Sequence, residues 1–262
     1  MSYSLRMQLM DSLVVKSQRR GLAIDREVVS APRGMIGLSQ NLNVEKDSTN
    51  TLVTGDGVIL TYVEIKKGSF FIGDQEMPSR FLLYIPKYSL VNIHFSPCRI
   101  FSLGVVSKKK IFKDINVPVL INVNEKITSI CSLLKISLPE KHLSFDPDLD
   151  VSPIIKESRQ YLLTCLTCHN PVSKASEQHG VNSYEISKKF KAAYKISPKS
   201  YVNRVRLFDA VFFLLNGKDI ITTALDSGFG DLKRFYSQFA RSLGSTPGVY
   251  KAKGKKRQEI SF

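Results

Sequence analysis

Two short runs of this 262-residue chain place cationic and hydrogen-bonding side chains at helical spacing. In the first run Lys188 follows Tyr184 by four residues, and in the second Ser237 follows Lys233 by four. Residues three or four apart lie on one face of a helix, where such side chains can reach base edges and phosphates. We therefore predict two DNA-binding faces, made of Tyr184, Ser187, Lys188 and Lys191 and of Lys233, Arg234, Ser237 and Arg241.

A second group of reactive side chains is the run from Cys165 through Cys168 to His169, which has the spacing of a c-type haem attachment site. Together with His179 it could also bind zinc. However, the N-terminal residues show no export signal, and the sequence has no second Cys-x-x-Cys pair. We therefore expect ordinary buried cysteines, with no metal, no cofactor and no catalytic residue.

The two candidate helices belong to an internal repeat. Five residues recur 49 positions later: Ile186, Phe190, Ser197, Pro198 and Tyr201 are matched by Phe235, Phe239, Thr246, Pro247 and Tyr250. Upstream, Ser176 and Gly180 match Ala224 and Gly228 at an offset of 48. Seven matches in the same order indicate a duplicated structural unit.

Each copy has the pattern of a helix-turn-helix unit. First helices are expected at residues 172–179 and 220–227, and the glycine after each suits the left-handed turn that follows a helix. Asn182 and Gly230 are the expected caps of the second helices. An apolar stripe at i, i+4 in those helices predicts a buried face opposite the candidate DNA-binding residues. A long helix that begins at Ser197 should join the two copies.

The charge distribution indicates a polyanionic partner for this part of the chain. There are 38 Lys and Arg residues against 23 Asp and Glu residues, a formal net charge of +15. Residues 1–150 contribute +4 (19 basic, 15 acidic) and residues 151–262 contribute +11 (19 basic, 8 acidic). Such a field attracts nucleic acid. The 43% hydrophobic content excludes a mainly disordered chain, and no apolar run is long enough to cross a membrane.

The N-terminal half has a different pattern. Between residues 51 and 106, short runs rich in β-branched and aromatic residues alternate with turn residues, as in GVILTYVEI, RFLLYIP and LVNIHF. This alternation predicts a small antiparallel sandwich or barrel. Helical spacing is found at residues 124–136 and 153–168, and a segment rich in proline and aspartate at 139–152 is the expected linker.

These patterns together predict an α+β protein. We expect a β-rich sensor or dimerisation domain with helices at residues 1–145. An all-α DNA-binding domain of two helix-turn-helix units should follow at 153–252, and a basic flexible tail at 253–262.

The C-terminal sequence resembles the DNA-binding domain of the AraC/XylS family of bacterial transcription regulators. The resemblance covers residues 153–252. Its motifs are KKFK-x5-SP-x2-Y, the pattern of Arg206, Leu207 and Ala210, the pair Gly228-Phe229, and F-x3-F ending in G-x-TP-x2-Y. It implies two helix-turn-helix units on a rigid helix that enter adjacent major grooves and usually activate transcription with RNA polymerase.

The family's base-contacting positions fall on six of the eight candidates: Tyr184, Ser187, Lys188, Lys233, Arg234 and Ser237. The second unit of the family often has arginine where this chain has Ser237. Because arginine contacts guanine through two hydrogen bonds, we expect the second helix to discriminate bases less than the first.

The N-terminal half resembles the cupin-like sensor domains of the same family in its pattern of short apolar strands and turns. Its only histidines are His94 and His142, too few for a cupin metal triad. The resemblance implies double-stranded DNA as partner, a homodimer formed through the N-terminal half, a small-molecule or protein effector, and a bacterial cytoplasmic location. The chain also looks like regulators of virulence and secretion genes.

We therefore expect a transcription activator and not an enzyme. The alternative is a DNA-targeted redox, metal or alkyl-transfer protein that uses its cysteines. The alkyl-transfer hypothesis rests on Cys98, which resembles the methyl-acceptor cysteine of DNA repair proteins. In those proteins a histidine follows the cysteine directly, whereas here Arg99 follows.

Overall fold

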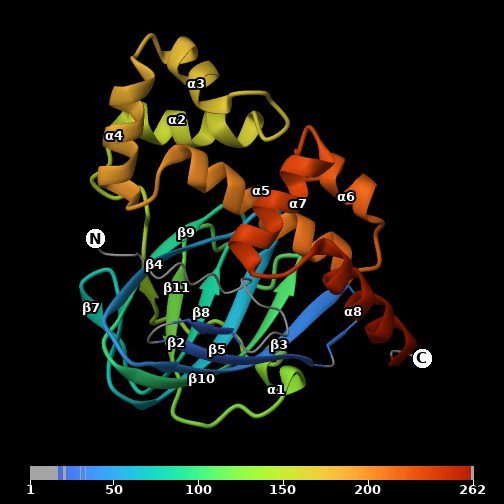
Figure 1. The fold of residues 1–262 in the computed structure, drawn as a ribbon. Helices are drawn as coiled ribbons and strands as arrows, with labels where there is room; N and C mark the ends of the chain where they lie inside the picture. Colours follow the sequence, from blue (N-terminus) through green and yellow to red (C-terminus); the bar gives the residue numbers. More distant parts are fainter. Residues whose placement is uncertain (1–16, 20–21, 30, 33, 261–262) are drawn as a thin grey trace.

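The computed structural model describes residues 17–19, 22–29, 31–32 and 34–260. It consists of an N-terminal β domain and a C-terminal helical region, which confirms the expected fold class. Figure 1 shows the C-terminal helices gathered over one end of the sheets. Residues 1–16, on which the expectation about an export signal depends, lie outside the described residues. No helix of the described chain is long and apolar enough to cross a bilayer.

The described strands form an eight-stranded sheet and a four-stranded sheet, with antiparallel neighbours throughout. Across the larger sheet the order is β1 (Ser17–Arg19), β2 (Leu22–Val29), β3 (Met35–Val44), β10 (Cys98–Ser107), β5 (Val58–Lys67), β8 (Arg80–Ile85), β11 (Val119–Asn122) and β12 (Leu143–Ser144). The segment expected as the linker contributes β12, which pairs with β11.

The smaller sheet covers one of the two apolar faces of the larger sheet. Its strands in order are β4 (Ser48–Val53), β9 (Leu90–Phe95), β6 (Phe70–Ile72) and β7 (Gln75–Glu76). Phe70 of the smaller sheet stacks on Phe81 of the larger one, with 5.6 Å between ring centroids. Both rings are buried. The two sheets therefore enclose one core, as the alternation of apolar runs predicts.

The helices are α1 (Ile130–Leu134), α2 (Pro153–Thr164), α3 (Pro171–His179), α4 (Ser183–Tyr194), α5 (Pro198–Leu215), α6 (Ile220–Asp226), α7 (Leu232–Leu243) and α8 (Pro247–Ile260). The helix expected over 124–136 is therefore too long. It starts only after Ser129, whose hydroxyl accepts a hydrogen bond from the Ser132 N–H (3.1 Å). Ile127 lies outside the helix but packs with Ile130 and Leu133 in a second apolar cluster, on the other face of the larger sheet. Burial here overrides local helical spacing.

The expected tail at 253–262 begins inside helix α8, which continues to residue 260; its flexibility stays a prediction. Helix α8 is anchored by Tyr250, which is buried against Phe239 with 5.0 Å between ring centroids. Gly254 lies directly against the carbonyl of Leu215, at a position that a larger residue could not occupy. This docking on the end of α5 explains why the basic sequence continues as a helix.

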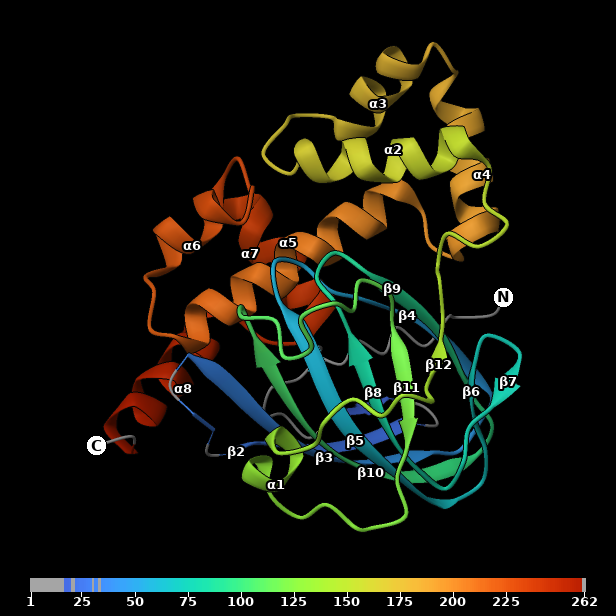
Figure 2. The same ribbon diagram turned by 180° about the vertical axis from the view of Figure 1, so that it is seen from behind.

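Helix α5 packs against the β domain and crosses the end of the sheets in both views (Figures 1 and 2). Phe208 is buried beside Gly57 of the β domain, where a Cβ on Gly57 would lie 3.0 Å from its ring. The next residue, Asp209, accepts a hydrogen bond from the backbone N–H of Asp56 (2.9 Å). One apolar cluster runs from the strands into α5, so the halves share a core.

Charged groups surround this contact. Lys108 forms ion pairs with Asp56 (2.8 Å) and Asp209 (3.4 Å), and Lys87 pairs with Asp56 (2.8 Å). Burial raises the pKa of the Asp209 carboxyl above its usual value, and the attraction of Lys108 opposes this only in part. At Asp56 burial also raises the pKa, but hydrogen bonds from Lys108 and Lys87 outweigh it, so that the pKa falls below its usual value.

Candidate nucleic-acid interface

Helix α4 buries one face and leaves the predicted face open. Its cap is Asn182, as expected, whose side chain accepts a hydrogen bond from the Tyr184 N–H (2.8 Å). Ile186 and Phe190 are fully buried, which confirms the predicted stripe. The side chain of Tyr184 is 75% exposed, and Lys188 is exposed one turn further on. An aromatic hydroxyl and an ammonium group therefore project from one accessible face.

Helix α7 repeats this arrangement in the second unit. Phe235 and Phe239 are fully buried, as predicted, whereas Lys233 and Ser237 are exposed. The cap differs from the expectation, since Asp231 and not Gly230 begins the helix by accepting a hydrogen bond from the Arg234 N–H (2.7 Å). A carboxylate bonds more strongly to the free N–H groups of a first turn than a bare glycine backbone can.

All eight candidate residues lie on these two helices. Tyr184, Lys188, Lys191, Lys233, Ser237 and Arg241 are exposed, and Ser187 and Arg234 are half-buried. Their role as DNA contacts stays a prediction.

The turns of the two units share a backbone hydrogen bond at equivalent positions, which confirms the register of the sequence repeat. Val181 donates its N–H to the Ser176 carbonyl (3.1 Å), and Phe229 donates its N–H to the Ala224 carbonyl (2.9 Å), again at an offset of 48. After the second helices, Lys195 has a φ of 59°, close to the 65° of its counterpart Gly244. The lysine is therefore held in a left-handed conformation that usually favours glycine.

Arg206 on α5 ties the two units together. Its Nε donates to the Leu166 carbonyl (2.7 Å) and a terminal nitrogen to the Cys168 carbonyl (3.3 Å), both in the loop between α2 and α3. Gly228 of the second unit, with a φ of 81°, packs against the same Leu166 carbonyl. Burial, followed by repulsion from Arg234, lowers the pKa of Arg206 to about 10. The guanidinium is thus charged at neutral pH and fixes the spacing of the units.

This contact gives the Cys165–Cys168 loop a structural role that the sequence did not reveal. The thiols of Cys165 and Cys168 are free, and Cys165 is buried. Among the described residues no group of three or more His, Cys, Asp or Glu side chains is placed to hold a metal ion. At Cys98, burial raises the thiol pKa to about 11, which opposes nucleophilic chemistry there.

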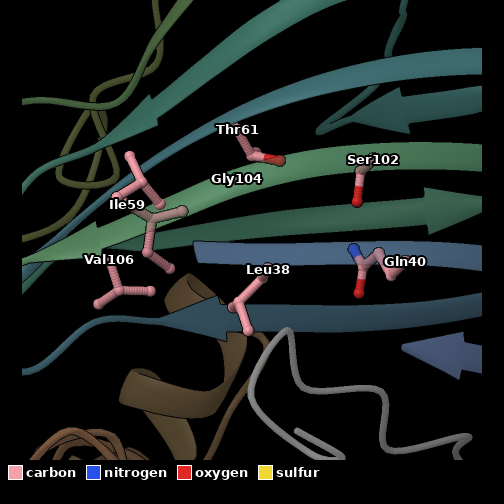
Figure 3. Close-up of a pocket in the computed structure, with 8 residues that line it drawn as sticks. Leu38, Gln40, Ile59, Thr61, Ser102, Gly104 and Val106 are labelled. Atoms are coloured by element: carbon pink, nitrogen blue, oxygen red, sulfur yellow. The ribbon is translucent and has the colours of Figure 1, made fainter. Parts of the chain in front are cut away.

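The β domain contains a second feature of functional interest, a narrow internal cavity. Figure 3 shows Gln40 and Ser102 close to each other on neighbouring strands, with Thr61 further along the cavity wall. A second cavity shares Gln40, Thr61 and Ser102 with the first and is also lined by Phe70 and Ile93 of the smaller sheet; its volume is about 40 Å³. The side-chain oxygen of Gln40 is buried without a protein hydrogen-bond partner. The cavity is therefore apolar with a polar end.

The sequence of the C-terminal region is similar to a known domain family and to two curated proteins. Residues 175–253 match a family described as a helix-turn-helix domain. The virulence regulon transcriptional activator VirF of Yersinia enterocolitica and the thermoregulatory protein LcrF of Yersinia pestis are each 31% identical over 77 residues. This match covers 29% of the present chain and 28% of each relative.

Solved structures are similar over different lengths. The C-terminal domain of the response regulator AraT from Geobacillus stearothermophilus is 23% identical with a TM-score of 0.37, covering 39% of this chain and 87% of that one. ToxT from Vibrio cholerae, solved with an unsaturated fatty acid, is 13% identical with a TM-score of 0.40, covering 80% and 96%.

The C-terminal region is thus a tandem helix-turn-helix domain, in which two similar units share one connecting helix. More particularly, residues 175–253 match the helix-turn-helix domain family, in the same stretch whose motifs resemble the AraC/XylS family.

Proposed function

We propose that this chain is a sequence-specific DNA-binding regulator that activates transcription together with RNA polymerase. The observation that carries the proposal is the pair of exposed cationic faces on α4 and α7, each backed by buried aromatic side chains. Helix α5 joins the two units, so both faces can enter successive turns of the major groove on one side of the duplex. The lysines and arginines supply phosphate contacts, and Tyr184 supplies a base contact.

The target genes are proposed to be virulence or secretion genes. Support comes from VirF, which is described as a virulence regulon transcriptional activator and matches the DNA-binding region. The site of action is the bacterial cytoplasm, where the DNA lies. The raised thiol pKa of Cys98 supports a regulator over the alkyl-transfer alternative.

The division of labour follows the two halves of the chain. Residues 1–145 act as the sensor or dimerisation domain, and residues 153–252 bind DNA. Because Phe208 and Asp209 of α5 are both in contact with the β domain, a change in that domain reaches the helix that carries both units.

A small-molecule effector would enter the internal cavity, with its polar group near Gln40. The cavity volume of about 40 Å³ is well below the roughly 300 Å³ of the smallest ordinary ligand pockets. The β domain would therefore have to expand on binding, which makes a protein effector the alternative.

Binding of the full-length protein to promoter DNA tests the proposal. Fluorescence anisotropy should show specific binding that weakens on the order of a thousandfold between about 50 and 200 mM salt, if about six phosphates are contacted. Lys188→Ala should weaken binding, whereas the matched control Lys135→Ala, an exposed lysine of the β domain, should not. Equal affinity for unrelated competitor DNA, or a flat salt titration, would refute the proposal.

A further inference from the structure

The loop between α2 and α3 holds a pair of neighbouring thiols that neither the fold nor DNA binding requires. Cys165 caps the end of α2, and Cys168 follows it in a turn closed by a hydrogen bond from the Cys168 N–H to the Cys165 carbonyl (3.0 Å). Both thiols are free. A hydrogen bond with the side chain of Cys165 is the largest of the causes that raise the pKa of the Cys168 thiol. The two sulfur atoms therefore lie beside each other.

The second unit shows that a helix-turn-helix of this chain folds without cysteines at these positions. By the offset of 48 that the turns confirm, Phe213 stands in the place of Cys165. Asn216 likewise stands in the place of Cys168, at the end of the helix that precedes α6. Among the described residues the pair has no third ligand that would complete a metal site. The chemistry that remains for two adjacent thiols is closure to a disulfide.

The contacts of this loop connect the thiol pair to both recognition units. Both views show the loop on the side of the first unit that faces α6 and α7 (Figures 1 and 2). The Leu166 carbonyl, between the two cysteines, accepts the hydrogen bond from Arg206 Nε (2.7 Å), and the Cys168 carbonyl accepts a second one (3.3 Å). Gly228 of the second unit packs on the same Leu166 carbonyl, where a Cβ would overlap the oxygen. The charge of Arg234, a predicted DNA contact on α7, acts on Arg206 as well.

We propose that Cys165 and Cys168 are a redox modification site, at which a reversible disulfide weakens DNA binding; this regulation rests on the proposed function. A disulfide brings the two sulfurs to about 2.05 Å, closer than two free thiols approach, so the backbone between them must adjust. That backbone carries the carbonyl that Arg206 binds and against which Gly228 packs. Oxidation therefore changes the spacing of α4 and α7, on which binding by two units depends. Disulfides of cytoplasmic proteins are usually transient in this way.

The reaction balances as two thiol–disulfide exchanges, with a low-molecular-weight disulfide as the oxidant. Cys168 is half-buried and Cys165 is buried, so the Cys168 thiolate attacks the oxidant first and releases one thiol. The Cys165 thiolate then attacks the sulfur of Cys168 and releases the second thiol. The protein loses two electrons and two protons, which the two released thiols carry away.

The first exchange requires an excess of oxidant at neutral pH. The hydrogen bond with Cys165, followed by burial, raises the pKa of the Cys168 thiol. The charges of Lys174 and Arg206 oppose this rise only in part. Little thiolate is therefore present at neutral pH, and the pair stays reduced until the oxidant accumulates.

The test compares reduced and oxidised full-length protein. The wild type is treated with dithiothreitol or with excess oxidised glutathione, mass spectrometry of its peptides maps the disulfide, and anisotropy measures the affinity for promoter DNA. We expect a disulfide between Cys165 and Cys168, an affinity at least tenfold lower, and recovery with dithiothreitol. The variant Cys165→Ser/Cys168→Ser should keep the affinity of the reduced wild type within twofold under both conditions. The matched control Cys131→Ser, which removes an exposed cysteine of α1, should respond to oxidation like the wild type.

A glutathione adduct at Cys168 without closure, a disulfide that leaves DNA affinity unchanged, or an equal loss of affinity in the double variant would overturn the proposal. Thermal unfolding of the reduced proteins identifies a variant that fails to fold, and Cys168→Ser, which keeps the buried Cys165, then replaces it under the same criteria. If the reduced wild type shows no specific DNA binding, the proposed function fails as a separate result. In that event urea unfolding of the oxidised and reduced forms tests the contacts of Arg206, and no disulfide or no loss of stability would overturn the proposal.

Discussion

Replacing Arg206 with alanine should lower both the stability of the protein and its affinity for DNA. The guanidinium is 3% exposed and donates hydrogen bonds to two carbonyls of the α2–α3 loop. A hydrogen bond from a charged donor contributes about 1.5–3 kcal/mol, and the desolvation of a buried guanidinium offsets part of the sum. We expect the free energy of unfolding to fall by about 3 kcal/mol and DNA affinity to fall with it, because the spacing of α4 and α7 is no longer fixed.

Urea unfolding of the full-length protein measures the first quantity, and anisotropy with promoter DNA measures the second. Arg241→Ala is the matched control for stability, since that arginine is exposed and should change the free energy of unfolding by less than about 0.5 kcal/mol. If Arg206→Ala behaves like the control in unfolding, the claim that Arg206 holds the units together is refuted.

Four further changes test separate parts of the account. Lys188→Ala should reduce the slope of log affinity against log salt by about 1. An unchanged slope in anisotropy titrations would show that Lys188 does not contact a phosphate. Ser237→Arg should increase the preference for guanine under the second unit by about 1–3 kcal/mol, measured with single-base variants of the site. An unchanged preference would show that residue 237 does not reach the bases. Because burial raises the folded-state pKa of Asp209, its ionised form destabilises the fold as pH rises through that pKa. Asp209→Asn should therefore gain stability relative to the wild type as the pH rises above about 4, the usual pKa of an aspartate. Urea unfolding measures this difference, and a relative loss of stability would contradict it. Gly228→Ala should cost at least about 1–3 kcal/mol, since its φ is 81° and a Cβ would overlap the Leu166 carbonyl; a neutral effect in thermal unfolding would contradict the contact.

The parts of the fold that local pattern controls could be predicted from the sequence. The repeat located both helix-turn-helix units because buried pairs such as Phe235 and Phe239 recur at helical spacing and at a fixed offset. Strand chemistry located β5, β8 and β9 for a similar reason, since alternation reflects which residues face the core. The basic faces of α4 and α7 followed from the same periodicity, as the residues opposite the buried stripe.

Features that depend on contacts between distant residues could not be predicted. Asp56 and Asp209 are 153 residues apart, and nothing near either one signals that they meet. Arg206 was visible only as part of a family motif, because its partners are backbone carbonyls that have no sequence signature. The short α1 was overestimated because the helical spacing at 124–136 reflected burial of Ile127 outside a helix.

Selection of binding sites from a library of randomised DNA tests the central claim most directly. The full-length protein should enrich two sequence elements with centres about 10 base pairs apart, one under each recognition helix. The element under α4 should carry more information than the element under α7, because Ser237 is too short for a two-point guanine contact. Enrichment of no sequence, or of a single element that persists unchanged when Tyr184 and Lys188 are replaced by alanine, would contradict the account.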